Sequence, residues 1–278
     1  MIKVASLRYG VIFKKAFSQP HIFTAFVKDF TGVDIEIDYV ETEKSFSPVI
    51  GKVDSHFDLF AEDKKNRIIV DIQHKRMNDH YDRFLHYHCA ALLEQISNSY
   101  SYRTNLRVFT IVVLTSGDKH KRDITITDFE PKDLQGKGVG ETRHKIIYTC
   151  PKYINENTPA PYREWLTAID DSLDGEVNEN DYKNKIIHDI FDLIQEDNTT
   201  PQEYARMKYQ YSNEEYMKEK NEKAKKKGIQ IGIQQGIQQG IQQTKQENAK
   251  TMLKEGIEIE LIAKITGFSI QAIRKFAS

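Results

Sequence analysis

The chain has 278 residues, of which 39% are hydrophobic and 29% are charged, enough for one substantial core and an appendage. Lys and Arg number 40 against 41 Asp and Glu, so the net charge of −1 gives no support for DNA binding without a local basic patch or a metal at an acidic centre. The opening residues lack the apolar stretch of a signal peptide, and Cys89 and Cys150 lack metal-ligand spacing, so we expect a cytoplasmic protein with no membrane partner.

The N-terminal part of the chain predicts two helices followed by a strand. The first becomes helical near Val11, and the second spans 21–30 after Pro20, which suits the first turn of a helix. The aromatic residues of both lie at helical spacing, which indicates core packing. Residues 33–41 alternate apolar and acidic, which predicts a half-exposed strand with solvent-facing acids, although Glu41 and Glu43 could approach a site on the strands that follow.

Residues 54–73 predict a β-hairpin that carries the candidate chemistry. Phe57, Leu59 and Ala61 alternate in part with polar residues, the cluster at 62–66 is a charged turn, and 67–73 is a β-branched strand. Because alternate side chains of a strand share a face, Asp71, Gln73 and Lys75 point to one side and Ile72 to the other. Strand pairing would bring Asp58 beside Asp71.

Two carboxylates, an amide and an ammonium on one side of a hairpin suit a divalent metal and a phosphate. Mg²⁺ prefers oxygen ligands and usually takes one or two carboxylates plus waters. A bound cation acidifies water and polarises a phosphoryl oxygen. The hypothesis is that Asp58 and Asp71 bind Mg²⁺, with Mn²⁺ as an alternative, and that Gln73 or Lys75 orients the water or holds the phosphate. On pattern alone, a solvated hairpin face is the commoner explanation.

The order of these motifs resembles that of the PD-(D/E)xK nuclease superfamily, and most closely its Rpn family of recombination-promoting nucleases and putative transposases. The second motif of that family is typically E-x-Q, which Asp71-Ile72-Gln73 matches with an acid one methylene shorter. Further matches to the family are Arg83 and Tyr87 for its R-x-x-x-Y, and Phe13, Lys14, Phe17, Gln95, Tyr102 and Val108. The departures are Gly10 for Asp, Ser99 for Gly and Arg107 for Pro.

This resemblance spans nearly the whole chain and carries expectations about fold and activity. It implies an α/β protein whose PD-(D/E)xK nuclease-like mixed sheet is flanked by helices and followed by a helical C-terminal extension. It also implies a Mg²⁺-dependent deoxyribonuclease, an endonuclease that hydrolyses DNA phosphodiester bonds during recombination, with catalytic residues Asp58, Asp71, Gln73 and Lys75. No organic cofactor is implied.

The helix expected from about His80 to about Asn98 carries Arg83 and Tyr87, which we assign to binding DNA phosphate. An ion pair of Arg83 with Asp79 or Glu94, or simple exposure of its side chain, is an equally weighted alternative. Further on, the apolar run 107–115 predicts a buried central strand, and 124–129 and 145–149 predict two more strands. The connection 116–123 is basic and could touch a DNA backbone, although a solvated loop is commoner. The Gly- and Lys-rich loop 131–142 lacks P-loop spacing.

The second half of the chain predicts helices and divides it into four segments. A helix around Trp165, one at 182–194 and one from Pro201 to about Lys220 follow the core. The expected segments are a nuclease-like core at 1–150, a helical extension at 151–217, a Gly/Gln-repeat helix or tether at 218–246 and a helical hairpin at 247–278.

Glycines at 228, 232, 236 and 240 recur every four residues, each followed by Ile. Each Gly costs a helix about 1 kcal/mol relative to Ala. We therefore predict either a tether or, as the favoured interpretation, a helix stabilised by self-association into a homo-oligomer. In the terminal hairpin, docking is favoured over base readout because its second helix carries Arg274 as its only arginine.

Two functions follow from the sequence. The first is the metal-dependent DNA endonuclease of the recombination-promoting, transposase-like type. The second is a catalytically decayed oligomeric scaffold that binds DNA or protein, which the presence of Asp71 in place of Glu and of Gly10 in place of Asp makes conceivable.

Overall fold

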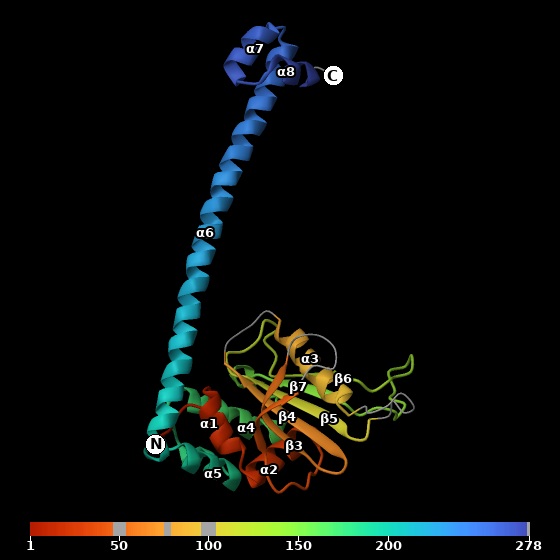
Figure 1. Ribbon diagram of the computed structural model, residues 1–278, viewed down its shortest axis with the longest axis vertical. Helices are drawn as coiled ribbons and strands as arrows, with labels where there is room; N and C mark the ends of the chain where they lie inside the picture. Colours follow the sequence, from red (N-terminus) through yellow and green to blue (C-terminus); the bar gives the residue numbers. More distant parts are fainter. Residues whose placement is uncertain (47–53, 75–78, 96–103, 277–278) are drawn as a thin grey trace. The chain divides into compact units, whose positions relative to one another are not determined.

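The computed structural model describes residues 1–46, 54–74, 79–95 and 104–276 (Figure 1). Two compact units divide the chain, Met1–Tyr211 and Ser212–Ser278. The first unit is a mixed α/β structure built on a six-stranded sheet flanked by helices, in agreement with the predicted fold class at that level. The helices after residue 150 belong to this unit as far as Tyr211.

The six-stranded sheet mixes antiparallel and parallel neighbours in the order β2-β3-β4-β5-β7-β6. The β2-β3-β4 run and the β7–β6 pair are antiparallel, whereas β4, β5 and β7 run parallel. Its strands are β2 Glu41–Phe46, β3 Ser55–Glu62, β4 Asn66–Gln73, β5 Arg107–Leu114, β6 Ile124–Asp128 and β7 Lys145–Thr149. A separate two-stranded sheet joins β1 Ile2–Lys3 and β8 Glu176–Val177. The hairpin and the three later strands of the sheet are therefore confirmed.

Helices cover both faces of the large sheet (Figure 1). On one face lie α1 Gly10–Phe17, α2 Pro20–Thr31, α4 Ala160–Asp171 and α5 Lys185–Ile194, and on the other lies α3 His80–Leu93. The predicted aromatic core is present, because Phe17, Phe26 and Trp165 pack together with ring centroids 5.1–6.2 Å apart. The indole N–H of Trp165 donates to Asp29 Oδ2 at 2.6 Å, which satisfies its polar group inside the core.

The strand predicted at 33–41 is wrong. Residues 33–40 have no strand structure, and the strand there is β2, which starts at Glu41. The alternation still has a physical basis, because Ile35 and Val40 are buried in the core while Asp34 pairs with Lys28 at 2.7 Å. The segment therefore packs its apolar side chains into the core. It does not form a strand, because none of the described strands pairs with it.

Several helix ends also differ from the prediction. The helix α3 ends at Leu93, ahead of the expected end near Asn98, which lies outside the described residues. The helix expected from residue 182 starts at Lys185, because Asn184 caps it by accepting the Ile186 N–H at 3.0 Å. Short 3-10 turns occupy Pro151–Tyr153, Ser172–Asp174, Glu179–Asp181 and Glu196–Asn198.

The helix expected to end near Lys220 instead continues as α6, Pro201–Lys254, through all four repeat glycines. Thr200 and Glu203 cap its start reciprocally, with Thr200 N–H donating to Glu203 Oε2 at 2.7 Å and Glu203 N–H to Thr200 Oγ1 at 3.2 Å. In the second unit, α7 Ile259–Thr266 and α8 Ile270–Phe276 close a small core around Ala249, Ile262 and Ile273. None of the helices in the described part of the chain combines the length and apolar character that a bilayer crossing demands.

Candidate active site

Asp58 and Asp71 face each other where the pairing of β3 with β4 ends. The pairs run from Glu62↔Arg67 to Leu59↔Val70, so the next step of the same register sets Asp58 opposite Asp71. At that step, hydrogen bonds from backbone N–H groups to the two carboxylates take the place of the backbone–backbone hydrogen bonds of the sheet. The Asp58 backbone N–H donates to Asp71 Oδ1 at 3.4 Å, and the Ile72 backbone N–H donates to Asp58 Oδ2 at 3.0 Å. The two carboxylates are thereby held across the hairpin by each other's strand.

The backbone is irregular at this step. Phe57 packs against Tyr87 on the α3 face, whereas Leu59 packs on the opposite face, so the two-residue alternation expected in β3 breaks at Asp58. In β2, Glu43 has a left-handed φ of 58°, and the pairs skip from Thr42↔Leu59 to Lys44↔Phe57. The skipped position of Glu43 is the one opposite Asp58. Three acids thus occupy neighbouring register positions on three adjacent strands.

Lys14 connects two of these acids from the helix α1. Its Nζ lies 3.5 Å from Asp58 Oδ1, and it also forms an ion pair with Glu43. In the sequence, Lys14 matches a motif of the resembled family and Glu43 is an acid that could approach the site, but neither is predicted to form part of it. Only the packing of α1 beside β3 brings the ammonium to the carboxylates, and no local pattern specifies that packing.

Burial dominates the electrostatics of the acid pair. Asp71 is 6% exposed, and burial together with the nearby charge of Asp58 raises its pKa well above the ordinary value. Burial also raises the pKa of Asp58, against the opposing charge of Lys14 and the Ile72 N–H bond. The charge of Arg83 and that of Lys14 lower the Asp71 pKa to a smaller extent. Because burial disfavours the ionised form of both carboxyl groups, a bound cation would stabilise their ionised form.

The donor set fits a hard divalent cation. Asp71 Oδ2 is buried and has no hydrogen-bond partner among the described residues, so one carboxylate oxygen is available as a ligand. Carboxylate and amide oxygens are the ligands that Mg²⁺ takes, commonly one or two carboxylates with the remaining positions filled by water. In the described ranges no cluster of three or more His, Cys, Asp or Glu side chains is arranged to hold a metal.

The other predicted site residues lie at different depths around this pair. Gln73 is half-buried at the end of β4, two residues after Asp71, and therefore on the same face of the strand. Lys75 lies outside the described residues. Arg83 is exposed on α3 and donates from Nε to the Tyr87 hydroxyl at 3.1 Å, with its guanidinium 5.2 Å from the Tyr87 ring centre. Tyr87 itself is mostly buried against Phe57 and Phe84, so it orients Arg83.

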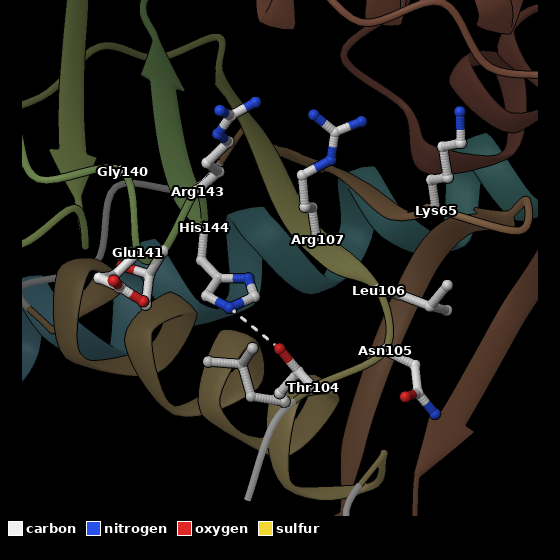
Figure 2. A pocket seen from close by; sticks show the side chains of 11 residues that line it. Lys65, Thr104, Asn105, Leu106, Arg107, Gly140, Glu141, Arg143 and His144 are labelled. Atoms are coloured by element: carbon white, nitrogen blue, oxygen red, sulfur yellow. Dashed lines mark hydrogen bonds between the residues drawn. The ribbon is translucent and has the colours of Figure 1, made fainter.

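A cavity of about 920 Å³ lies elsewhere, at the amino ends of β5 and β7 (Figure 2). Lys65, Arg107 and Arg143 extend in one direction along its wall, and His144 turns the other way to bond Thr104 at 3.3 Å. Asp71 and Gln73 sit at the carboxyl end of β4, which runs parallel to β5. The cavity and the acid pair are therefore at opposite ends of the sheet, and the chemistry favours the acids as the candidate active site.

Comparison with known proteins adds no assignment. The chain matches no family model, and no curated protein or solved structure matches it.

Proposed function

We propose that the protein is a metal-dependent DNA endonuclease of the PD-(D/E)xK type, similar to the recombination-promoting, transposase-like nucleases. The single observation that carries the proposal is the acid pair. Asp58 and Asp71 are held across the end of a hairpin, and a buried oxygen of Asp71 lacks a partner in the described structure. The strand order β2-β3-β4 with the parallel β5 beside it supports the nuclease-like fold. A cytoplasmic location belongs to the same proposal.

Each residue has a distinct part in this proposal. Asp58 and Asp71 would hold Mg²⁺, or Mn²⁺ in its place. The cation supplies charge neutralisation and an acidified water. Gln73, on the same face as Asp71, would hold that water by its amide, and Lys75 is proposed as its alternative. Arg83, held in place by Tyr87, would bind a phosphate of the DNA. The charge on the phosphodiester and that on the acid pair are then both compensated.

Cleavage of supercoiled plasmid tests this proposal. Purified protein with Mg²⁺ or Mn²⁺ should convert supercoiled DNA to the nicked form, and EDTA should stop it. Asp71→Asn keeps the shape of the side chain and removes its charge, so we expect at least a ~100-fold loss of rate, in the range that a positioned catalytic group supplies. Asp128→Asn, an exposed acid of β6, is the matched control and should cleave like wild type. Equal trace rates for wild type and Asp71→Asn would exclude the nuclease.

A non-catalytic scaffold that binds DNA or protein is the second candidate function. It is favoured by Lys14, whose ammonium already compensates Asp58 and Glu43 without a metal. Calorimetry separates the two candidates. Binding of Mn²⁺ that is lost in Asp58→Asn supports the enzyme, whereas no heat with either Mg²⁺ or Mn²⁺ supports the scaffold.

We further propose that α6 assembles the chain into a homo-oligomer. At 1.5 Å per residue the 54-residue helix is roughly 80 Å long, and Ala249 is its only buried residue. Five isoleucines of the repeat are between 44% and 57% exposed, and a Cβ on any of the four repeat glycines would meet nothing within 4 Å. Since tertiary packing supplies most helical stability, a helix with four glycines needs a partner, and a second copy of α6 offers the complementary Ile and Gly rows.

Light scattering during size-exclusion chromatography tests the assembly. Ile233→Gln/Ile237→Gln/Ile241→Gln removes three of the five exposed isoleucines of the repeat with little change in helix propensity and should shift the mass to that of a monomer. Gln235→Ala/Gln239→Ala/Gln243→Ala changes the face about 200° away and should leave the mass unchanged. A wild-type mass of one chain at ~50 μM would refute the proposed oligomer.

A further inference from the structure

We propose that the loop at 115–123 is a contact surface for the phosphate backbone of duplex DNA. The inference rests on the proposed nuclease function, because it concerns how the DNA would lie on the acid pair. The loop carries four basic side chains in sequence, Lys119, His120, Lys121 and Arg122, and all four are exposed.

The loop begins beside the candidate active site. Thr115 follows β5 directly, and its backbone N–H donates to the Gln73 carbonyl at 3.1 Å. Its hydroxyl also bonds His74 Nδ1 at 2.9 Å. Gln73 stands two residues beyond Asp71, which is roughly 7 Å along a strand. DNA with a phosphate at Asp71 would therefore have its neighbouring phosphates at the level of this loop.

Both acids of the loop are turned inward and used by the fold. Asp118 is 1% exposed, and it accepts the Tyr81 hydroxyl at 2.5 Å and the His120 N–H at 2.6 Å. Asp123 accepts the Thr158 hydroxyl at 2.6 Å. Among the described residues, neither acid forms an ion pair with Lys119, Lys121 or Arg122. Within the described part of the chain, Lys119, Lys121 and Arg122 form no ion pair, which leaves three positive charges facing solvent.

The loop has a fixed shape. Gly117 has φ +78° and lies against the Tyr153 ring, and the Tyr153 hydroxyl donates to the Asp118 carbonyl at 3.2 Å. At the other end, the Cys150 N–H donates to the Asp123 carbonyl at 2.7 Å. Lys121 has a left-handed φ of 53°, a strained backbone conformation that is uncommon for a residue with a side chain. Fixed cations lose less freedom on binding than a mobile loop would.

Anisotropy of a fluorescein-labelled 20-bp DNA duplex, titrated in EDTA at several salt concentrations, tests the surface without cleavage. The variant is Lys119→Glu/Lys121→Glu/Arg122→Glu. We expect its Kd to be at least ~10-fold weaker than wild type at 0.1 M salt. The slope of log K against log salt should fall by about 0.9 for each DNA phosphate that the variant no longer neutralises.

A matched control lies at the opposite end of the sheet. Lys132, Lys137 and Arg143 are also two lysines and one arginine, all exposed, and they precede β7 at its amino end. Lys132→Glu/Lys137→Glu/Arg143→Glu makes the same change in net charge, so a general electrostatic effect would weaken both variants alike. We expect the control to bind within ~2-fold of wild type.

A separate variant distinguishes binding from folding. Lys121→Gly removes one charge and relieves the left-handed strain, so DNA affinity should fall ~2–3-fold while the melting temperature stays equal or rises. The proposal is overturned if the loop variant binds like wild type, if the control weakens as much, or if wild type does not bind the duplex. If Asp71→Asn loses plasmid cleavage but binds the duplex as tightly as wild type, the result supports the loop as the DNA contact surface. If Asp71→Asn cleaves plasmid like wild type, the result excludes the nuclease function and leaves the loop proposal to the binding assay.

Discussion

Lys14 Nζ lies 3.5 Å from Asp58 Oδ1, so a side chain of α1 brings a positive charge to the first acid of the hairpin. The same ammonium pairs with Glu43, the residue at the register position opposite Asp58. A divalent cation at Asp58 and Asp71 would be repelled by Lys14 and would compete with it for Asp58. Lys14 therefore sets the metal affinity of the site in the proposed function.

Replacing Lys14 by Met should tighten cation binding. The substitution keeps an unbranched side chain and removes the competing charge, so we expect the Mn²⁺ Kd from calorimetry at pH 7.5 to fall about tenfold, or ~1.4 kcal/mol. Lys15→Met is the matched control, because Lys15 carries the same charge one residue along and pairs with Glu203 at 3.0 Å. Weaker Mn²⁺ binding in Lys14→Met than in wild type would show that Lys14 supports the metal ligands.

Asp71→Asn should stabilise the metal-free protein at neutral pH. Burial and Asp58 raise the pKa of Asp71, so the folded state keeps this proton to a higher pH than the unfolded chain does. The stability that wild type gains from the protonated Asp71 is fully present below the pKa of an Asp in the unfolded chain, about 4. It is lost as the pH rises through the raised pKa of Asp71 in the folded state. Because the asparagine side chain of the variant cannot ionise, the free energy of unfolding of the variant should rise relative to that of wild type as the pH increases from about 4 to 8.

We expect the difference in unfolding free energy between the variant and wild type to grow over this pH range, and each kcal/mol corresponds to roughly 2–4 °C in Tm. Thermal unfolding in EDTA across this pH range measures it. Addition of Mn²⁺ should raise the Tm of wild type and not that of Asp71→Asn, because the cation stabilises the folded state only where it binds. A pH-independent difference between the two proteins would refute the linkage.

Gly10→Asp should stabilise α1 by about 0.5–1.5 kcal/mol. The helix has no acid in its first turn and no side-chain cap, so a carboxylate at its start would favour the helix dipole. A Cβ at Gly10 would meet only Lys14 Nζ, at 3.9 Å, so the new acid would also pair with Lys14. Urea unfolding measures the change, and Gly10→Asn is the control of equal size without charge. Equal stability of the two variants would show that charge has no part.

Gly117→Ala should be more destabilising than Gly136→Ala. Both glycines have a left-handed φ, +78° and +84°, so both substitutions carry the backbone cost of about 1–2 kcal/mol. Only Gly117 adds a collision, since its Cβ would lie 2.7 Å from the Tyr153 hydroxyl, whereas nothing lies within 4 Å at Gly136. We expect a further ~1–3 kcal/mol from overpacking, measured by urea unfolding.

The double variant Gly117→Ala/Tyr153→Ala identifies the source of that extra cost. If the collision with the ring is responsible, the two substitutions will cost less together than the sum of their separate effects. If the losses in unfolding free energy are additive, the cost of Gly117→Ala comes from the backbone conformation alone.

Local patterns in the sequence were sufficient for most elements of the first unit. Alternation and β-branched runs predicted β3, β4, β5, β6 and β7, and helical spacing predicted the aromatic packing of α1, α2 and α4. The same patterns placed Asp58 and Asp71 on paired strands. They failed at 33–41, because alternation reports which side chains are buried and not whether a partner strand is present to form a ladder. They also ended the helix from Pro201 near Lys220, whereas α6 continues to Lys254 through the glycine repeat, for which a helix was the favoured of the two predictions.

The sequence alone determined that two acids sit at facing positions of one hairpin, because register follows from strand length and a short turn. Tertiary structure alone decided what surrounds them. Lys14 comes from a helix packed beside the sheet, Glu43 faces Asp58 through an irregular step in β2, and the basic loop begins beside Gln73 because β5 runs parallel to β4. Contacts between residues distant in the chain depend on how whole elements pack, and no short-range pattern specifies that packing.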